Sequence, residues 1–321
     1  MPDASPSSTV HGLHHVTVVA SDPAANLAFY TETLGLRLVK RSVNQDAPEV
    51  YHLFYADADG SPGTDLTFFP HPGLPRGTRG TGQIVEVAFS IPVGSLAFWA
   101  ARLDAHDVAF GVPEERFGKP ALPLEDPDGL RLALVETDRP MDVALWDESP
   151  VAPDHQLRGM HSVRLWERDL TPTARLLTEV MGLETVGIQD GWHRYGLDDG
   201  RPGTIAEVQV PANAPQGRSG AGIIHHTAWR TPTDADQAAM RAAFQKVGLR
   251  PTQPIDRFWF RSVYAHEPGG ALFELATDDP GFTADEAHEN LGGTLILPPW
   301  LESKRDAIEA ALPSLETASD T

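Results

Sequence analysis

Gly222-Ile223-Ile224-His225-His226-Thr227-Ala228-Trp229 is the stretch of this sequence from which the fold can be worked out. Its apolar and β-branched residues predict a β-strand that carries two adjacent histidines. Neighbouring side chains of a strand point to opposite faces, so both histidines reach one pocket only if the strand has a bulge or a twist. A similar segment lies near the start of the chain, Gly12-Leu13-His14-His15-Val16-Thr17-Val18. Two such strands in one chain indicate an internal repeat.

Four successive stretches of the chain predict the same order of elements, namely one strand, one helix and three further strands. In the first unit Asp22 or Ser21 can cap a helix that has Pro23 in its first turn and that ends at Gly35. The elements of this unit are expected at residues 13–19, 24–33, 37–44, 50–56 and 64–69. The other units are expected to begin with strands at Ile84, Met160 and Ile224 and to have helices at 94–106, 171–181 and 234–247.

Two pairs of similar segments align the first unit with the third. Phe29–Leu36 is similar to Leu176–Leu183, and Ser61–Thr64 is similar to Arg201–Thr204. The sequence therefore predicts an α+β protein of four βαβββ modules in two tandem halves. The two halves are expected at residues 11–140 and 155–282, with a proline-containing linker at 137–157. A tail is expected at 283–321, with one helix at 299–312.

The composition excludes several classes of protein. A formal net charge of −20 over 321 residues disfavours nucleic-acid binding, which relies on basic patches. This acidity fits either a salt-rich host or the base composition of the genome. No apolar run reaches the roughly 18 residues of a membrane helix, and residues 1–10 lack a signal-peptide pattern, so a cytoplasmic protein is expected. Because the chain has no cysteine, only nitrogen and oxygen can hold a metal.

Glu274 lies in the middle of the apolar run Gly270–Ala276. A buried carboxylate without a partner costs several kcal/mol, so Glu274 has to meet a cation, a proton or a metal. His226 opens the same unit, and His15 occupies the equivalent place in the first unit. Two imidazoles and one carboxylate form a three-ligand face that suits Fe(II) and leaves positions open for other ligands. Mn(II) or Zn(II) would accept the same three residues.

The repeats and these three residues resemble the vicinal oxygen chelate superfamily, which includes glyoxalase I, extradiol ring-cleaving dioxygenases and fosfomycin resistance proteins. More narrowly, the chain from about residue 11 to about residue 300 resembles the hydroquinone-type ring-cleaving dioxygenases. The segments that carry this resemblance are His14–Thr17, Ile224–Thr227, Asp256–Tyr264 and Glu267–Phe282.

The resemblance implies that each pair of modules forms a curved mixed sheet around a cavity. It implies a non-haem, Fe(II)-dependent extradiol-type dioxygenase that opens the ring of a hydroquinone or a related dihydric phenol with O2, with Mn(II) as the alternative metal. The expected metal ligands are His15, His226 and Glu274. A monomer is feasible, and family members often form homo-oligomers.

The resemblance also places five further residues at the site, namely His14, Thr17, His225, Arg257 and Tyr264. Tyr264 and His225 are expected to handle protons, and Arg257 to offset negative charge. A para-diol cannot bind a metal through both hydroxyls, so its distal oxygen needs another partner, for which His14 and Arg257 are the two candidates. The structural alternatives are a plain hydrogen bond for each histidine, a surface ion pair for Arg257 and a core position for Tyr264.

A second constellation comes from the middle units. Glu86 of the second unit and His161 of the third stand at the His226 position, and Glu207 stands at the Glu274 position. These three residues could form a second metal site. The alternative, which we favour, is a vestigial cavity in which the carboxylates pair with Arg164 or another arginine.

Two other functions compete with a dioxygenase. A glyoxalase-type isomerase or lyase would normally need a fourth protein ligand, yet the first unit carries Thr67 at the Glu274 position. A quinone- or drug-binding protein would be expected to have a degraded metal site, whereas all three ligands are present. Fold alone does not decide among these functions.

Overall fold

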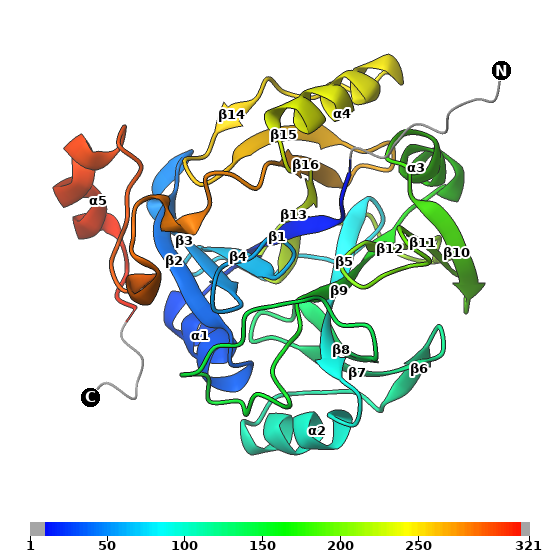
Figure 1. Cartoon of the computed structure of the whole chain (residues 1–321), viewed down its shortest axis with the longest axis horizontal. Helices are drawn as coiled ribbons and strands as arrows, with labels where there is room; N and C mark the ends of the chain where they lie inside the picture. Colours follow the sequence, from blue (N-terminus) through cyan, green and yellow to red (C-terminus); the bar gives the residue numbers. More distant parts are fainter. Residues whose placement is uncertain (1–9, 316–321) are drawn as a thin grey trace.

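The computed structural model describes residues 10–315. The first nine residues, which include most of the segment inspected for a signal peptide, and the last six residues of the expected tail lie outside this part. Figure 1 shows two curled sheets side by side, with the helices on their outer sides. Each sheet has eight strands, in the orders β14-β15-β16-β13-β1-β4-β3-β2 and β10-β11-β12-β9-β5-β8-β7-β6.

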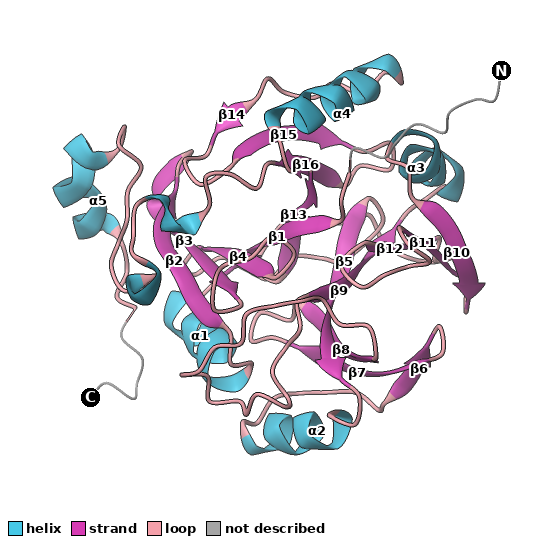
Figure 2. Cartoon of the chain, in the orientation of Figure 1, coloured by secondary structure: helices cyan, strands magenta, loops and turns pink. Residues whose placement is uncertain are grey.

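The first sheet is built from the first and the fourth module (Figure 2). The first module comprises β1 (Leu13–Ala20), α1 (Pro23–Ala28), a π-helical segment (Phe29–Thr33), β2 (Arg37–Asn44), β3 (Ala47–Ala56) and β4 (Asp65–Pro70). The fourth comprises β13 (Ile223–Arg230), α4 (Asp234–Lys246), β14 (Ile255–Asp256), β15 (Arg261–His266) and β16 (Leu272–Ala276).

The second sheet is built from the second and the third module. The second module comprises β5 (Gln83–Pro92), α2 (Leu96–Ala105), β6 (Glu114–Arg116), β7 (Lys119–Glu125) and β8 (Arg131–Thr137). The third comprises β9 (Met160–Trp166), α3 (Leu170–Arg175), a π-helical segment (Leu176–Val180), β10 (Glu184–Gln189), β11 (Trp192–Gly196) and β12 (Ile205–Gln209). The expected α+β fold of four βαβββ modules and two curved sheets is confirmed, and the boundaries of the tandem halves stay a prediction.

The start of the first helix follows from its local sequence. The Asp22 carboxylate accepts hydrogen bonds from the N–H groups of Ala24 and Ala25, and Pro23 is the first helical residue. At its C-terminal end the helix differs from the expected single α-helix, because its last turn, Phe29–Thr33, is a wider π-helical segment that precedes Gly35. The third module repeats this widening, which agrees with the sequence similarity between the two segments.

The two strands that carry the histidine doublets are neighbours at the centre of the first sheet. β1 pairs antiparallel with β13, and β13 pairs in parallel with β16, so the strands of His15, His226 and Glu274 lie side by side. The β1–β13 ladder has two irregularities, at which His14 and His225 are the extra residues. These two bulges reorient the side chains locally, as the alternation of side chains along a strand required.

One buried lysine of the outer strand of this sheet helps to hold the tail in place. Lys40 on β2 is fully buried, and its ammonium group donates to the Phe282 carbonyl and pairs with Asp285 and Glu286. The expected tail helix is shorter than predicted, with a 3₁₀ turn (Glu302–Lys304) leading into α5 (Arg305–Ala311). Among the helices of residues 10–315, none is long and apolar enough to cross a membrane.

Candidate metal centre and substrate cavity

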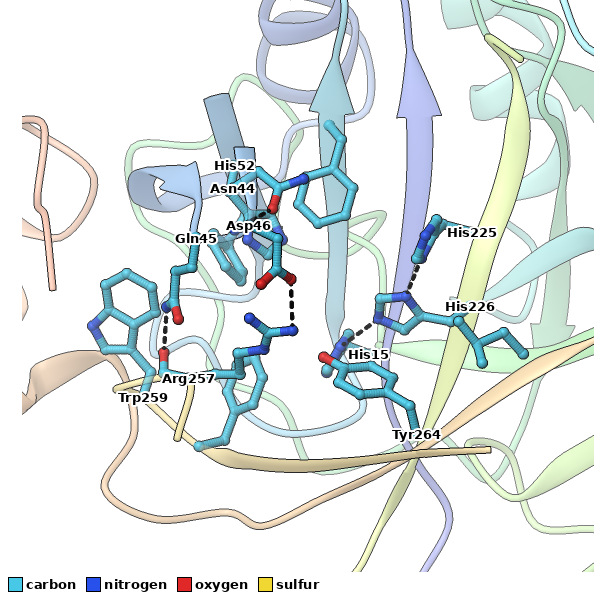
Figure 3. A pocket seen from close by; sticks show the side chains of 14 residues that line it. His15, Asn44, Gln45, Asp46, His52, His225, His226, Arg257, Trp259 and Tyr264 are labelled. Atoms are coloured by element: carbon cyan, nitrogen blue, oxygen red, sulfur yellow. Dashed lines mark hydrogen bonds and ion pairs between the residues drawn. The ribbon is translucent and has the colours of Figure 1, made fainter. Parts of the chain in front are cut away.

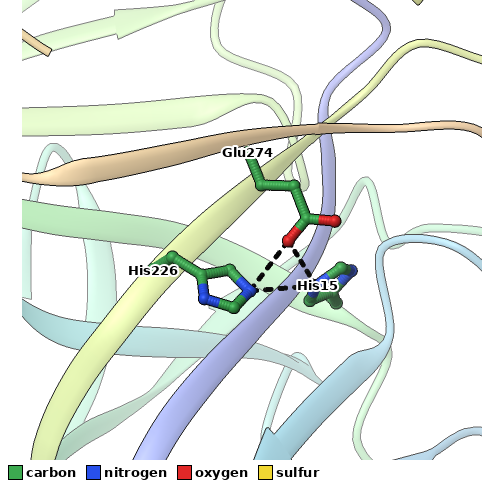
Figure 4. A group of neighbouring side chains, drawn as sticks. All are labelled: His15, His226 and Glu274. Atoms are coloured by element: carbon green, nitrogen blue, oxygen red, sulfur yellow. Dashed lines mark hydrogen bonds and ion pairs between the residues drawn. The ribbon is translucent and has the colours of Figure 1, made fainter. Parts of the chain in front are cut away.

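Three buried side chains from neighbouring strands converge on one point (Figure 4). His226 Nε2 lies 2.8 Å from Glu274 Oε2, and His15 Nε2 lies 3.3 Å from both of these atoms. A metal ion with bonds of about 2.1 Å spaces adjacent ligand atoms at about 3.0 Å in octahedral and about 3.4 Å in tetrahedral geometry. The observed triangle therefore fits three ligands on one face of an ion. Within the described part of the chain, this is the one cluster of this kind.

The carboxylate of Glu274 is oriented so that one oxygen remains for an ion. Ser262 on β15 donates its hydroxyl to Glu274 Oε1 at 2.5 Å. Oε2 is buried, and its short contact with His226 lacks hydrogen-bond geometry, so no donor satisfies it. A buried carboxylate oxygen without a donor is costly, and a bound cation would remove that cost.

Each ligand histidine is bonded to the bulged histidine that precedes it. The Nδ1 atoms of His14 and His15 are 2.9 Å apart, and those of His225 and His226 are 2.7 Å apart. His14 also directs its Nε2 at the Thr277 carbonyl, at 3.1 Å, and must donate there. His14 Nδ1 is then an acceptor, so the proton of His15 sits on Nδ1 and the lone pair of His15 Nε2 is free for a metal.

Burial and the Glu274 charge set the protonation of the cluster without a metal. Burial opposes ionisation of Glu274, but the two ligand imidazoles outweigh it and hold the pKa of this carboxyl well below its usual range. Burial favours neutral His15, yet Glu274 prevails and raises the pKa of His15, whereas burial prevails at His226 and lowers its pKa. Burial also lowers the pKa of His14 to about 3 and that of His225 to about 4.

A cavity of about 260 Å³ opens beside the triad (Figure 3). Among the residues expected at the site, His225, Arg257 and Tyr264 line this cavity together with the two ligand histidines. The Arg257 guanidinium pairs with Asp46 at 2.9 Å and lies 5.5 Å from the centre of the Tyr264 ring. Burial raises the pKa of Tyr264, so its phenol stays protonated at neutral pH.

Two of the expected site residues do not line the cavity. His14 is buried between His15 and Thr277, as described above. Thr17 is also buried, and its hydroxyl lies 2.8 Å from that of Thr67. Thr17 therefore acts on the cavity only through other side chains.

Sequence reasoning missed several residues of the cavity wall. The β2–β3 hairpin places Gln45 and Asp46 at the cavity, and the loop before β15 adds Trp259 and Phe260. His52 on β3 also lines the cavity, although its position in the sequence suggested no role. The alternation of β3 was the available signal, because it puts His52 on the same face as the neighbouring pocket residue Phe54.

The equivalent place in the second sheet is filled by arginines. Arg116 binds Glu86 at 2.5 Å, and Arg164 and Arg194 both bind Glu207. This supports the alternative favoured from the sequence, in which the two carboxylates pair with arginines instead of binding a metal.

The alignment of His161 with His226 is wrong. His161 is the extra residue of a bulge in β9, equivalent to His14 and His225, and Ser162 stands at the ligand position. A second ligand imidazole is therefore missing there.

Known proteins share this fold and these motifs. The model of the Glyoxalase/Bleomycin resistance protein/Dioxygenase superfamily matches residues 12–134. The chain is also 41% identical to MhqE of Bacillus subtilis (strain 168), a protein assigned as a ring-cleaving dioxygenase, over 95% of this chain and 99% of that protein. The chain belongs to this superfamily. A further superfamily member, the chlorohydroquinone/hydroquinone 1,2-dioxygenase of Sphingobium indicum, is 34% identical over 93% of this chain and 95% of that protein.

Solved structures of the superfamily agree with the fold described above. The crystal structure of a Bacillus subtilis protein described as a dioxygenase superposes with a TM-score of 0.91 at 38% identity, over 97% of this chain and 99% of that one. Maize glyoxalase I shares the fold at a TM-score of 0.59 and 16% identity, over 83% of this chain and 92% of that one. The resemblance expected from the sequence, to a superfamily that includes ring-cleaving dioxygenases, is confirmed.

Proposed function

We propose that this chain is a non-haem Fe(II)-dependent dioxygenase that opens the ring of a hydroquinone or a related dihydric phenol with O2. The observation that carries the proposal is the convergence of His15 Nε2, His226 Nε2 and Glu274 Oε2 at the wall of a cavity of about 260 Å³. This donor set is the one used by Fe(II) oxygenases that keep open positions. The names of the relatives support ring cleavage as the reaction.

The metal would be held by the three converging atoms, with Mn(II) as the alternative ion. Bound Fe(II) would supply open coordination positions and a redox couple for the reaction between the aromatic ring and O2. The tautomer that His14 fixes keeps the Nε2 atom of His15 available to it, and the Nδ1–Nδ1 contact of His225 with His226 allows the same arrangement at His226.

The residues of the cavity wall have properties that suit the remaining tasks. Tyr264 is a protonated phenol at the cavity, so it can give a proton to an oxygen of the substrate. His225 is neutral and lines the cavity, and because its Nδ1 is hydrogen-bonded to His226, its Nε2 is the atom that can exchange a proton with the substrate. Arg257 stays cationic and can offset negative charge that develops on oxygen.

The deciding experiment is anaerobic reconstitution with Fe(II), followed by O2 uptake with hydroquinone, with catechol and with the adduct of methylglyoxal and glutathione. We expect uptake with hydroquinone and turnover of the ring to an open-chain product. The absence of O2 uptake with every diphenol would refute the proposal, and isomerisation of the adduct would favour a glyoxalase. The position of Thr67 disfavours that outcome, because its hydroxyl is bonded to Thr17 and His52 and offers no carboxylate.

The proton role of Tyr264 has a test of its own. Replacing Tyr264→Phe keeps the ring and removes only the hydroxyl, so the metal should stay bound while ring opening slows by about a hundredfold or more. Metal content and O2 uptake are measured on the same preparation. Full activity in this variant would show that Tyr264 does not transfer a proton.

A further inference from the structure

His52 is held at the cavity by a series of hydrogen bonds that runs through Thr67 to Thr17. His52 Nε2 lies 2.9 Å from the Thr67 hydroxyl, which lies 2.8 Å from the Thr17 hydroxyl. The His52 ring also packs in a tilted arrangement against the rings of Phe54 and Phe69, with ring centres 3.8 Å and 4.4 Å away. These contacts restrict the orientation of the His52 ring at the cavity.

The tautomer of His52 follows from the number of protons in this series of hydrogen bonds. Thr17 is fully buried, and within the described residues its hydroxyl contacts Thr67 alone. The Thr17 proton must therefore go to Thr67, because a buried hydroxyl without an acceptor is costly. The Thr67 proton then goes to His52 Nε2, which accepts it. Burial keeps His52 neutral by lowering its pKa, so its one ring proton is on Nδ1.

His52 thus carries an N–H donor on Nδ1, and no hydrogen bond within residues 10–315 uses it. A para-diol with one oxygen at the metal places its second oxygen across the cavity, where a donor is needed. His14, one of the two candidates from the sequence, does not line the cavity. Arg257, the other, already pairs with Asp46 and lies over Tyr264. His52 lines the cavity, carries a donor that is not used, and has not been assigned to proton transfer or to charge compensation.

We propose that His52 is a specificity-determining residue that donates its Nδ1–H to the substrate oxygen distal to the metal. Thr67 and Thr17 are positioning residues that hold the required tautomer. The inference rests on the proposed function and extends it, because it assigns the preference for a second ring oxygen to one side chain. A phenol, with one oxygen, cannot engage the metal and His52 at the same time.

The size of the expected effect follows from the cost of an unmet donor. A site built to hydrogen-bond a substrate hydroxyl discriminates against an analogue that lacks it, because the donor is then left without a partner. One such hydrogen bond corresponds to about a tenfold difference in affinity. The Mn(II)-loaded protein should therefore bind hydroquinone about ten times more tightly than phenol.

The test compares anaerobic binding of hydroquinone and phenol to Mn(II)-loaded protein by calorimetry, in the wild type and in four variants. His52→Phe keeps an aromatic ring against Phe54 and Phe69, and should reduce the affinity ratio to about one without changing metal content. Thr67→Val frees the tautomer and should lower the ratio, whereas Thr67→Ser should preserve it. His193→Phe, on β11 of the other sheet, is the matched control and should leave the ratio unchanged.

The outcomes separate the inference from the proposed function. A wild type that binds both ligands equally, or a His52→Phe variant that keeps the wild-type ratio, would overturn the role of His52. If His52→Phe does not fold, an unchanged ratio in Thr67→Val would overturn it. Failure of O2 uptake with every diphenol would instead reject the dioxygenase, and the binding ratios would still decide whether His52 reads the second oxygen.

Discussion

Glu274 is the charged residue among the three proposed metal ligands. Replacing Glu274→Gln keeps the size of the side chain and removes the charged ligand. We expect affinity for Mn(II) to fall by more than about a hundredfold, which exceeds the loss typical of residues that only orient ligands. Titration followed by electron paramagnetic resonance measures this affinity. Glu289→Gln, an exposed carboxylate of the tail, is the control, and equal affinities in both variants would contradict the assignment.

His15 should make metal binding depend on pH. Its pKa is raised in the metal-free protein, and a metal can bind only the neutral imidazole. Protons therefore compete with the metal below this pKa, and Mn(II) affinity should rise with pH and level off once His15 is neutral. The pairing of protonated His15 with Glu274 stabilises the apo fold below the unfolded pKa of 6.5 and is lost as pH rises through the folded pKa.

Calorimetry over a pH series measures both effects of His15. The midpoint of thermal unfolding of the apo protein should fall as the affinity for Mn(II) rises. An affinity that does not change across neutral pH would show that no proton is displaced from the site.

At the residue scale, the sequence predicted the three residues that converge in the structure but only part of the cavity. His15, His226 and Glu274 could be found because a repeat aligns them and because a carboxylate in an apolar run needs a partner. His52 could not be found in this way, because its role depends on Thr67 of another strand. Thr17 was expected at the site, but only the structure shows that it reaches the cavity through Thr67 and His52.

At the element scale, the bulges of β1 and β13 explain why the alternation rule does not apply to the doublets. The sequence predicted each strand from its apolar residues, and it also showed that a bulge or twist was needed. It could not show where the extra residue lies, because a bulge depends on the register with the partner strand. The bulges at His14 and His225 decide which histidine of each doublet faces Glu274.

Lys40 strengthens the contact between the tail and β2, which also includes a backbone hydrogen bond from Ile296 to Arg41. Replacing Lys40→Met leaves Asp285 and Glu286 without their cation, and breaking a buried ion pair costs about 3–5 kcal/mol. We expect the free energy of unfolding to fall by about this amount, and the chain around Phe282 to be cut more readily by proteases. Chemical denaturation and limited proteolysis measure the two effects. Lys304→Met, which changes an exposed lysine, is the control.

An additional variant tests whether the charges cause the Lys40 effect. Lys40→Met combined with Asp285→Asn and Glu286→Gln removes the unpaired carboxylates, and should recover much of the lost stability. A triple variant as unstable as Lys40→Met would attribute the effect to packing against Trp259, whose ring centre lies 5.4 Å from the Lys40 ammonium.

At the scale of the whole molecule, each sheet takes one module from each tandem half. The metal ligands divide in the same way, with His15 in the first half and His226 and Glu274 in the second. Fragments 1–154 and 155–321, produced separately, should therefore bind no Mn(II) tightly. Mixing them should restore about one equivalent per pair, because arginines fill the equivalent place in the second sheet. Tight binding by either fragment alone, or two equivalents in the full chain, would refute this prediction.

The exchange of modules between the two sheets has a consequence for the origin of the protein. A chain of two modules that forms a two-fold symmetric dimer would build two identical sheets, each with one module from either copy. Joining the two copies end to end gives the strand order seen in this protein. Once the two sites were encoded separately, selection could act on each alone. One kept its histidines, while its duplicate exchanged the site for ion pairs.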